Sequence, residues 1–146
     1  MKSDGTLRSR RRLAAVMILM ALSATACRSA VAEVAEPVEP FALEPIEGTD
    51  VSRLILTQDA IQRIALETAP IVADRSVLLI PASAVWIDVD GVSWIYTNPE
   101  PRTFVRAEVV VARYDRHTAV LSEGPPVGVA VVTVGVAELI GSEFGI

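Results

Sequence analysis

The chain has 146 residues, a formal net charge of −5 at neutral pH and a single cysteine, Cys27. One cysteine excludes an internal disulfide framework. Five of the 13 basic residues and one of the 18 acidic residues precede Cys27, and the remainder carries eight arginines against 17 acidic side chains, a formal charge of −9. Nucleic acids and anionic lipid surfaces select clustered basic residues, so we expect no nucleic acid partner.

Residues 1–26 have the layout of a lipoprotein signal peptide. Basic residues lie between Lys2 and Arg12, and apolar or small residues follow without interruption from Leu13 to Ala26. This stretch is shorter than the roughly 20 apolar residues that a helix needs to cross a bilayer. Small residues directly before Cys27 resemble a lipobox, although Ala24 stands where lipoboxes usually carry a larger aliphatic residue.

We therefore expect lipidation of Cys27, with ordinary cleavage beside a free thiol as the alternative. A lipid there makes the chain an exported protein, anchored to a membrane and facing the periplasm or the cell exterior. Whether the membrane is the inner or the outer one stays open.

Residues 27–50 are expected to form an acidic, proline-rich tether. Pro37, Pro40 and Pro45 alternate with five glutamates, and no helical or strand period is visible. Prolines remove backbone donors, and like charges repel, so this composition favours a disordered spacer.

Residues 51–146 are long enough for one small domain, which the sequence predicts to be mainly β: a small β-barrel or sandwich of about six to eight strands with one short helix. Thr57 is a suitable N-cap for that helix, over residues 58–66. β-Branched residues at period two dominate after Pro70. Strands are expected at residues 76–80, 84–88, 92–97, 103–113, 119–122 and 130–134.

Asp90-Gly91 is the strongest turn signal in the domain, because such a pair favours a two-residue hairpin turn. That turn would place Val89 opposite Val92, Ile87 opposite Trp94 and Val85 opposite Tyr96. One face of the hairpin would then be apolar, and Asp88 would lie opposite Ser93 on the other face.

The sequence gives little support for an enzyme. Motifs for phosphate binding, for zinc proteases and for serine hydrolases are missing, and His117 is the sole histidine. All three methionines precede Cys27, so soft metal ligands are scarce, and we expect neither a metal nor a cofactor. Asp88 and Asp90 are better explained by turn geometry than by acid–base catalysis.

Trp86 and Trp94 are the two large aromatic residues whose position bears on partners. Tryptophans in strands more often pack in a core or on a strand face than form a ligand cage. The alternative is that they contact a partner, which an exposed Trp86 would favour.

A series of short motifs in the second half of the domain resembles a known family. They are Pro-x-x-Ala-Val at residues 81–85, Asp-Gly-x-x-Trp-Ile-Tyr at 90–96, Phe-Val at 104–105, and Gly-Pro-x-x-Gly at 124–128 followed by valines at 131–132. Their order and spacing over residues 80–138 resemble the membrane-proximal domain of periplasmic adaptor subunits. These are the membrane fusion proteins of resistance-nodulation-division efflux pumps.

The resemblance implies a non-catalytic β-domain that rests on an inner-membrane transporter. A full adaptor also carries a long α-helical hairpin and a lipoyl-like domain, and neither fits between Val72 and Ser76. The chain is therefore expected to be a reduced adaptor or a stand-alone membrane-proximal module. Two other classes stay open, a small-ligand-binding lipoprotein and a structural envelope lipoprotein unrelated to transport.

Overall fold

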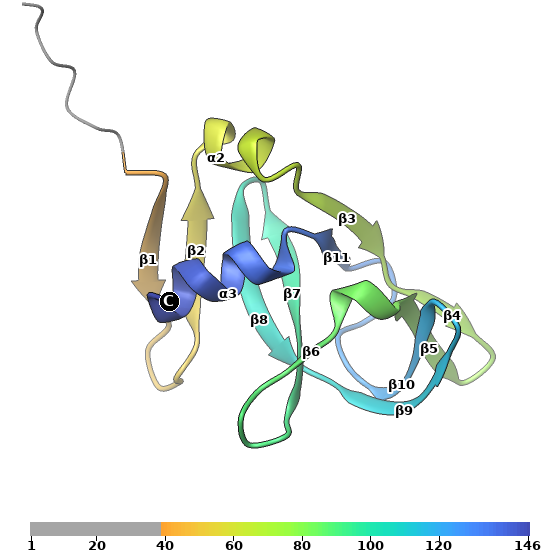
Figure 1. Cartoon of the computed structure of the whole chain (residues 1–146). Helices are drawn as coiled ribbons and strands as arrows, with labels where there is room; N and C mark the ends of the chain where they lie inside the picture. Colours follow the sequence, from red (N-terminus) through yellow and green to blue (C-terminus); the bar gives the residue numbers. More distant parts are fainter. Residues whose placement is uncertain (1–38) are drawn as a thin grey trace, which may run out of the picture. The chain divides into compact units, whose positions relative to one another are not determined.

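The computed structural model describes residues 39–146, which belong to a compact unit spanning Pro37–Ile146. The predicted signal peptide, Cys27 and the first part of the predicted tether lie outside the described residues. Within them, the prediction of a mainly β domain is confirmed, because eleven strands form two antiparallel sheets (Figure 1).

The first sheet has seven strands. In spatial order they are β1 (Phe41–Pro45), β2 (Ser52–Leu56), β8 (Thr103–Glu108), β7 (Ser93–Glu100), β11 (Ala130–Val134) and β3 (Glu67–Pro70), and β6 (Trp86–Ile87) pairs with β7 beside this path.

The second sheet has four strands, in the order β4 (Val72–Asp74), β5 (Val77–Pro81), β10 (Thr118–Glu123) and β9 (Val110–Asp115). Both sheets end in edge strands, so neither closes into a barrel within residues 39–146. The strands also outnumber the six to eight expected, because several are only two to four residues long.

Two buried residues carry the chain from one sheet to the other. Val109 separates β8 from β9, and Ile71 separates β3 from β4. The Val109 amide donates to the Ser93 carbonyl, which ties this corner to β7. The single strand expected over residues 103–113 is therefore wrong, since such a corner needs only a buried aliphatic residue and shows no turn signal.

The core has two clusters, one on each face of the seven-stranded sheet. The first contains residues of both sheets, and the second joins the seven-stranded sheet to the helices. Ile95 and Val131 belong to the first cluster, whereas their neighbours Tyr96 and Val132 belong to the second. This division follows from strand geometry, because successive side chains point to opposite faces.

The expected helix is present as α2 (Gln58–Arg63), and the Thr57 hydroxyl accepts from the Ala60 amide at 3.1 Å as an N-cap. It ends earlier than expected because Ala65 takes a positive φ of 49°. A short 3₁₀ turn, η1 (Ala82–Ala84), stands at the start of the strand expected over residues 84–88, which is reduced to β6.

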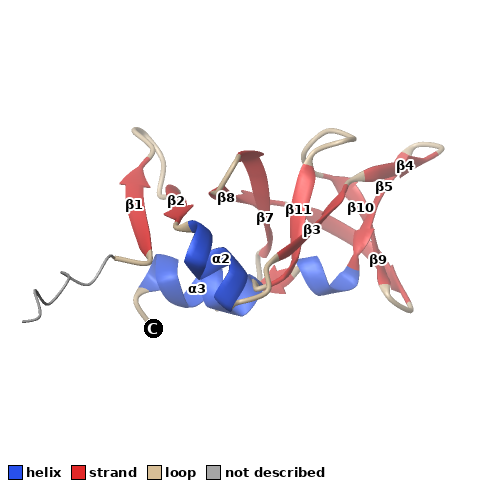
Figure 2. Cartoon of the chain, turned by 90° about the horizontal axis from the view of Figure 1, so that it is seen from above, coloured by secondary structure: helices blue, strands red, loops and turns tan. Residues whose placement is uncertain are grey.

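A second helix, α3 (Val136–Phe144), was not expected from the sequence. It follows β11 through Gly135, whose φ of 93° reverses the chain. Leu139 is fully buried, and Val136 and Ile140 pack around the second core cluster. Viewed from above, α2 and α3 lie on the same side of the seven-stranded sheet (Figure 2).

The boundary expected between tether and domain at residue 51 is wrong for β1. Phe41 to Pro45 pair in register with Leu56 to Ser52 of β2, and Phe41 packs against the second core cluster. The glutamate and proline content suggested a spacer, but a lone edge strand needs only one apolar anchor and tolerates Pro at its end.

Candidate functional site

The β6–β7 hairpin projects from the body of the domain at the bottom of Figure 1, and its register differs from the expected one. Trp86 pairs with Trp94 and Ile87 pairs with Ser93. The loop therefore contains three residues between Asp88 and Val92 rather than the expected two, with Gly91 at a φ of 83°.

This one-residue shift moves every side chain of β6 to the opposite face. Trp86 now shares a face with Trp94, whereas Ile87 is 60% exposed and Val89 at the tip is fully exposed. The expected apolar face of Val85, Ile87 and Val89 is therefore wrong. Two branched aliphatic side chains are presented to solvent instead.

The Asp88 carboxylate stabilises the hairpin loop by accepting hydrogen bonds from other residues of the hairpin. Its Oδ1 accepts from the amides of Asp90 and Val92, both at 2.9 Å, and its Oδ2 accepts from the Trp94 indole N–H at 2.8 Å. The indole bond is the main reason that the pKa of Asp88 lies below its ordinary value, and the Val92 amide adds to it. The prediction that Asp88 serves turn geometry is confirmed, although its position opposite Ser93 is not.

Behind the hairpin, Trp86 lies at the centre of an aromatic group. Its ring is stacked at 6.3 Å from Trp94 and 6.1 Å from Tyr96, and it meets Phe144 of α3 edge-on at 6.1 Å. Its indole N–H is buried without a hydrogen-bond partner among the described residues. Both tryptophans are half-buried on a strand face, and their contact with a partner stays a prediction.

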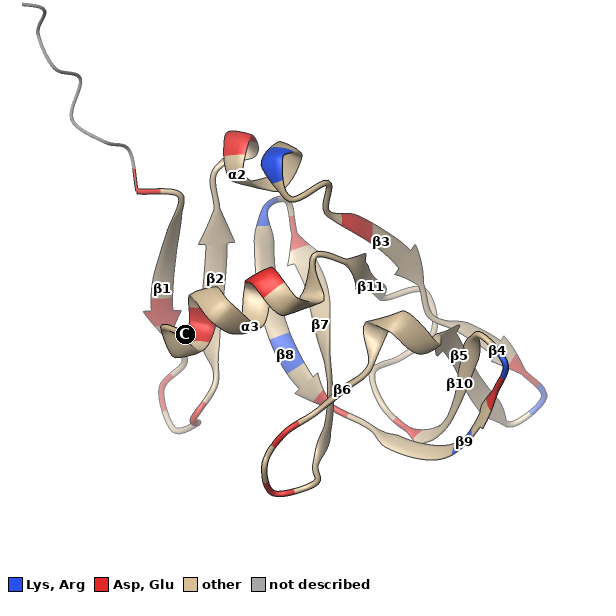
Figure 3. Ribbon diagram, in the orientation of Figure 1, with Lys and Arg blue, Asp and Glu red and all other residues tan. Residues whose placement is uncertain are grey.

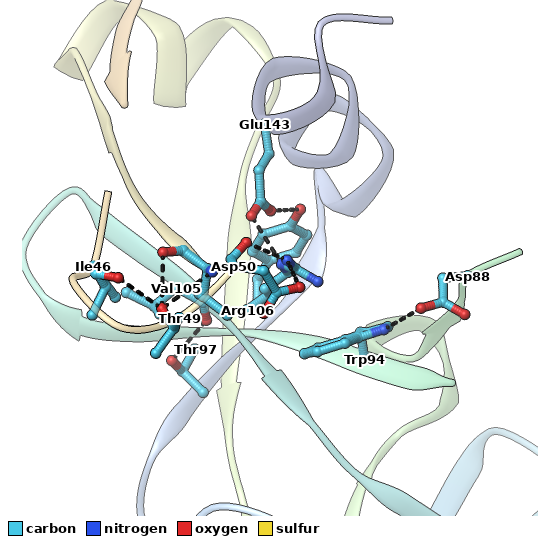
Figure 4. Close-up of polar contacts among 11 residues, drawn as sticks. Ile46, Thr49, Asp50, Asp88, Trp94, Thr97, Val105, Arg106 and Glu143 are labelled. Atoms are coloured by element: carbon cyan, nitrogen blue, oxygen red, sulfur yellow. Dashed lines mark hydrogen bonds and ion pairs between the residues drawn. The ribbon is translucent and has the colours of Figure 1, made fainter. Parts of the chain in front are cut away.

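Arg106 of β8 joins the aromatic group to two other segments, α3 and the β1–β2 loop. Its guanidinium carbon lies 4.4 Å from the centre of the Trp94 ring. Its Nε donates to Glu143 of α3 at 3.0 Å, and its Nη2 donates to both the carbonyl and the carboxylate of Asp50, in the β1–β2 loop, at 2.6 and 2.8 Å (Figure 4).

The Glu143 carboxylate is buried with Arg106, their side chains being 6% and 7% exposed. Its second oxygen accepts from the Tyr96 hydroxyl at 2.6 Å. Burial, reinforced by this carboxylate, raises the pKa of Tyr96 far above its ordinary value, so the phenol stays protonated and keeps donating. The end of α3 is thereby fixed to β7 and β8.

The tip is acidic as well as apolar. Asp88 and Asp90 are its charged residues, and residues 85–93 contain no Lys or Arg (Figure 3). A surface of this kind favours a partner that offers apolar contacts beside basic groups.

Other positions singled out in the sequence lie elsewhere. His117 is exposed in the turn between β9 and β10, as expected of a turn residue, and borders an open hollow of about 340 Å³. A second open hollow, of about 510 Å³, has Glu138 and Ser142 as its polar lining, but the Ser142 hydroxyl is bonded to a backbone carbonyl of α3.

Residues 39–146 hold no group of three or more His, Cys, Asp or Glu side chains placed to bind a metal ion. Over the same residues, no helix combines the length and the apolar character needed to cross a membrane.

Comparison of the chain with protein-family models, with curated proteins and with solved structures found no match in any of the three.

The residues that support the hairpin were largely missed from the sequence. Arg106, Asp50 and Glu143 were not singled out. Arg106 alone carried a signal, because an arginine at an inward position of an apolar strand requires a buried partner. Asp50 and Glu143 meet it only through the fold, 56 and 37 residues away.

Proposed function

We propose that this chain is a non-catalytic docking module, anchored to a membrane through a lipid on Cys27 and bound to a transporter or another envelope protein by its β6–β7 hairpin. The observation that carries the proposal is the exposure of apolar side chains at the tip of this hairpin. Ile87 at the end of β6 and Val89 in the loop are exposed, and hydrogen bonds of Asp88 to the Val92 amide and the Trp94 indole fix this part of the hairpin. A preorganised apolar projection loses little conformational freedom on binding, which favours association.

The resemblance to adaptor subunits supports a transporter as the partner. The Asp-Gly-x-x-Trp-Ile-Tyr motif of that resemblance forms the projecting hairpin and the strand behind it. The chain would then act as a reduced adaptor that contacts a transporter without reaching an outer channel. Its acidic surface makes nucleic acid an unsuitable partner.

Site-specific photocrosslinking in native membranes tests the proposal. The full-length chain would carry the photoreactive residue at position 89, and a matched control would carry it at Arg116, in the exposed β9–β10 turn. We expect a crosslink to one polytopic membrane protein from position 89 and none from position 116, with the partner identified by mass spectrometry. Crosslinks that are equal at both positions, or absent at position 89, would contradict docking by the hairpin.

The anchor has a separate test. Mass spectrometry of the mature N-terminus is expected to show acyl chains on Cys27, and Cys27→Ala is expected to release the protein from the membrane fraction. An unmodified Cys27 in a membrane-free protein would contradict the anchor while leaving the hairpin experiment valid in a detergent extract.

A further inference from the structure

The exposed tip is connected to distant parts of the fold by an unbroken series of polar and aromatic contacts. The tip amides donate to Asp88, Asp88 accepts from the Trp94 indole, and the Trp94 ring lies under Arg106. Arg106 in turn bonds Asp50 and Glu143. Each link is at hydrogen-bond distance or in stacking range.

We propose that Trp94 and Arg106 are positioning residues for the docking tip, which they orient by linking Asp88 to α3 and to the β1–β2 loop. Two of the linked segments are remote from the tip in sequence, so this part of the orientation comes from the fold rather than from the local turn geometry of Asp88. Its importance for docking rests on the proposed function. The contacts themselves can be tested without a partner.

The two tryptophans differ in whether the indole N–H has a hydrogen-bond partner. Trp94 uses its N–H to hold Asp88, whereas the N–H of Trp86 is buried without a partner among residues 39–146. A change from tryptophan to phenylalanine removes the same group at both positions. Only at Trp94 does it remove a bond to the tip.

Arg106 acts on Trp94 through its guanidinium group, whose carbon lies over the indole ring at 4.4 Å from the ring centre. A lysine at this position would keep a positive charge near Glu143 but would lose the planar stacking and the forked geometry. Arg106→Lys therefore weakens the contact with Trp94. Because it keeps a positive charge near the buried Glu143 carboxylate, it avoids the unfolding that Arg106→Ala risks.

Amide hydrogen exchange measured by NMR tests the series of contacts from Arg106 through Trp94 to Asp88, which we call the relay. Residues 39–146 are suitable for this measurement, because they include both core clusters and all eleven strands. We expect Trp94→Phe to speed exchange at Asp90 and Val92 by about tenfold, since it removes a bond to a carboxylate. Trp86→Phe is the matched control and should leave these amides within about twofold. The β10 amides of Ala119 and Val120 report any global loss of stability.

The order of the contacts makes a separate prediction. Arg106→Lys should speed exchange at Asp90 and Val92 less than Trp94→Phe does, and the double variant should equal Trp94→Phe alone, because Arg106 acts on Asp88 only through Trp94. Additive effects, an equal effect of Trp86→Phe, or no effect of Trp94→Phe on the tip would overturn the relay. If exchange behaves as expected but position 89 yields no crosslink, the relay stands and the docking function fails.

Discussion

Among single residues, Arg106 combines two ion pairs with a contact to an aromatic ring. It is buried, and its two carboxylate partners differ sharply in environment, since the Glu143 side chain is 6% exposed and the Asp50 side chain is 82% exposed. A solvated carboxylate such as Asp50 gains little from an ion pair, whereas a buried one depends on it. The bond to Glu143 therefore dominates the contribution of Arg106 to stability.

Arg106→Ala should lower the free energy of unfolding by about 3 kcal/mol, because it leaves the Glu143 carboxylate buried without a positive charge. Chemical denaturation measures the change. The matched control is Arg113→Ala, which breaks a 3.8 Å pair with Asp115 between side chains that are both more than 60% exposed. The control should change stability by less than about 0.5 kcal/mol, and equal losses in the two variants would contradict a special role for Arg106.

The order of the hairpin tip should depend on pH through Asp88. Its pKa in the fold is depressed below 3.8, mainly by the Trp94 indole bond, so the ionised form is the one that holds the loop. The stabilisation is present in full above the pKa of the unfolded chain and is lost as pH falls through the lower pKa of the folded state. NMR shifts of the Asp90 and Val92 amides should follow this titration, and Asp88→Asn should abolish it.

Among helices and strands, the sequence predicted the features that depend on contacts between residues close together in the chain. Thr57 caps α2 because its hydroxyl accepts from an amide three residues ahead, and the β-branched run of β11 lies on a strand. The hairpin register could not be predicted in the same way, because Asp88 captures two loop amides and stabilises a three-residue loop that Asp90-Gly91 does not signal.

β1 and α3 are among the elements that the sequence did not reveal, and both depend on tertiary packing. β1 has one sheet partner, β2, and α3 follows a strand after a single glycine. The spacing of Val136, Leu139 and Ile140 fits one helix face and could have indicated α3. The sequence of β1 has no such pattern, because five residues that include a proline and a glutamate are also typical of a spacer.

The boundary of the domain gives a prediction at this scale. A chain that starts at residue 47 lacks β1 and the packing of Phe41, so it should be less stable than a chain that starts at residue 39 by about 2 kcal/mol or more. Thermal unfolding of the two chains, followed by circular dichroism, measures the difference. Identical midpoints would show that residues 39–46 belong to a tether after all.

Across the part of the molecule that the structure describes, the four-stranded sheet and the helices α2 and α3 all pack against the seven-stranded sheet. One face of it packs against the four-stranded sheet and the other against α2 and α3. The hairpin extends from this sheet through β7, which contacts both core clusters through Ile95 and Tyr96. The tip is therefore attached to a strand that is packed on both faces, as a docking element requires.

Co-purification of a transporter from native membranes tests the docking function most directly, with the tagged full-length chain compared against Val89→Asp and the control Val127→Asp. Both valines are exposed, so neither change should affect folding. The proposal predicts that one polytopic transporter co-purifies with the wild type and with Val127→Asp, and that Val89→Asp reduces its recovery at least tenfold. Equal recovery with Val89→Asp, or no transporter with the wild type, would contradict it.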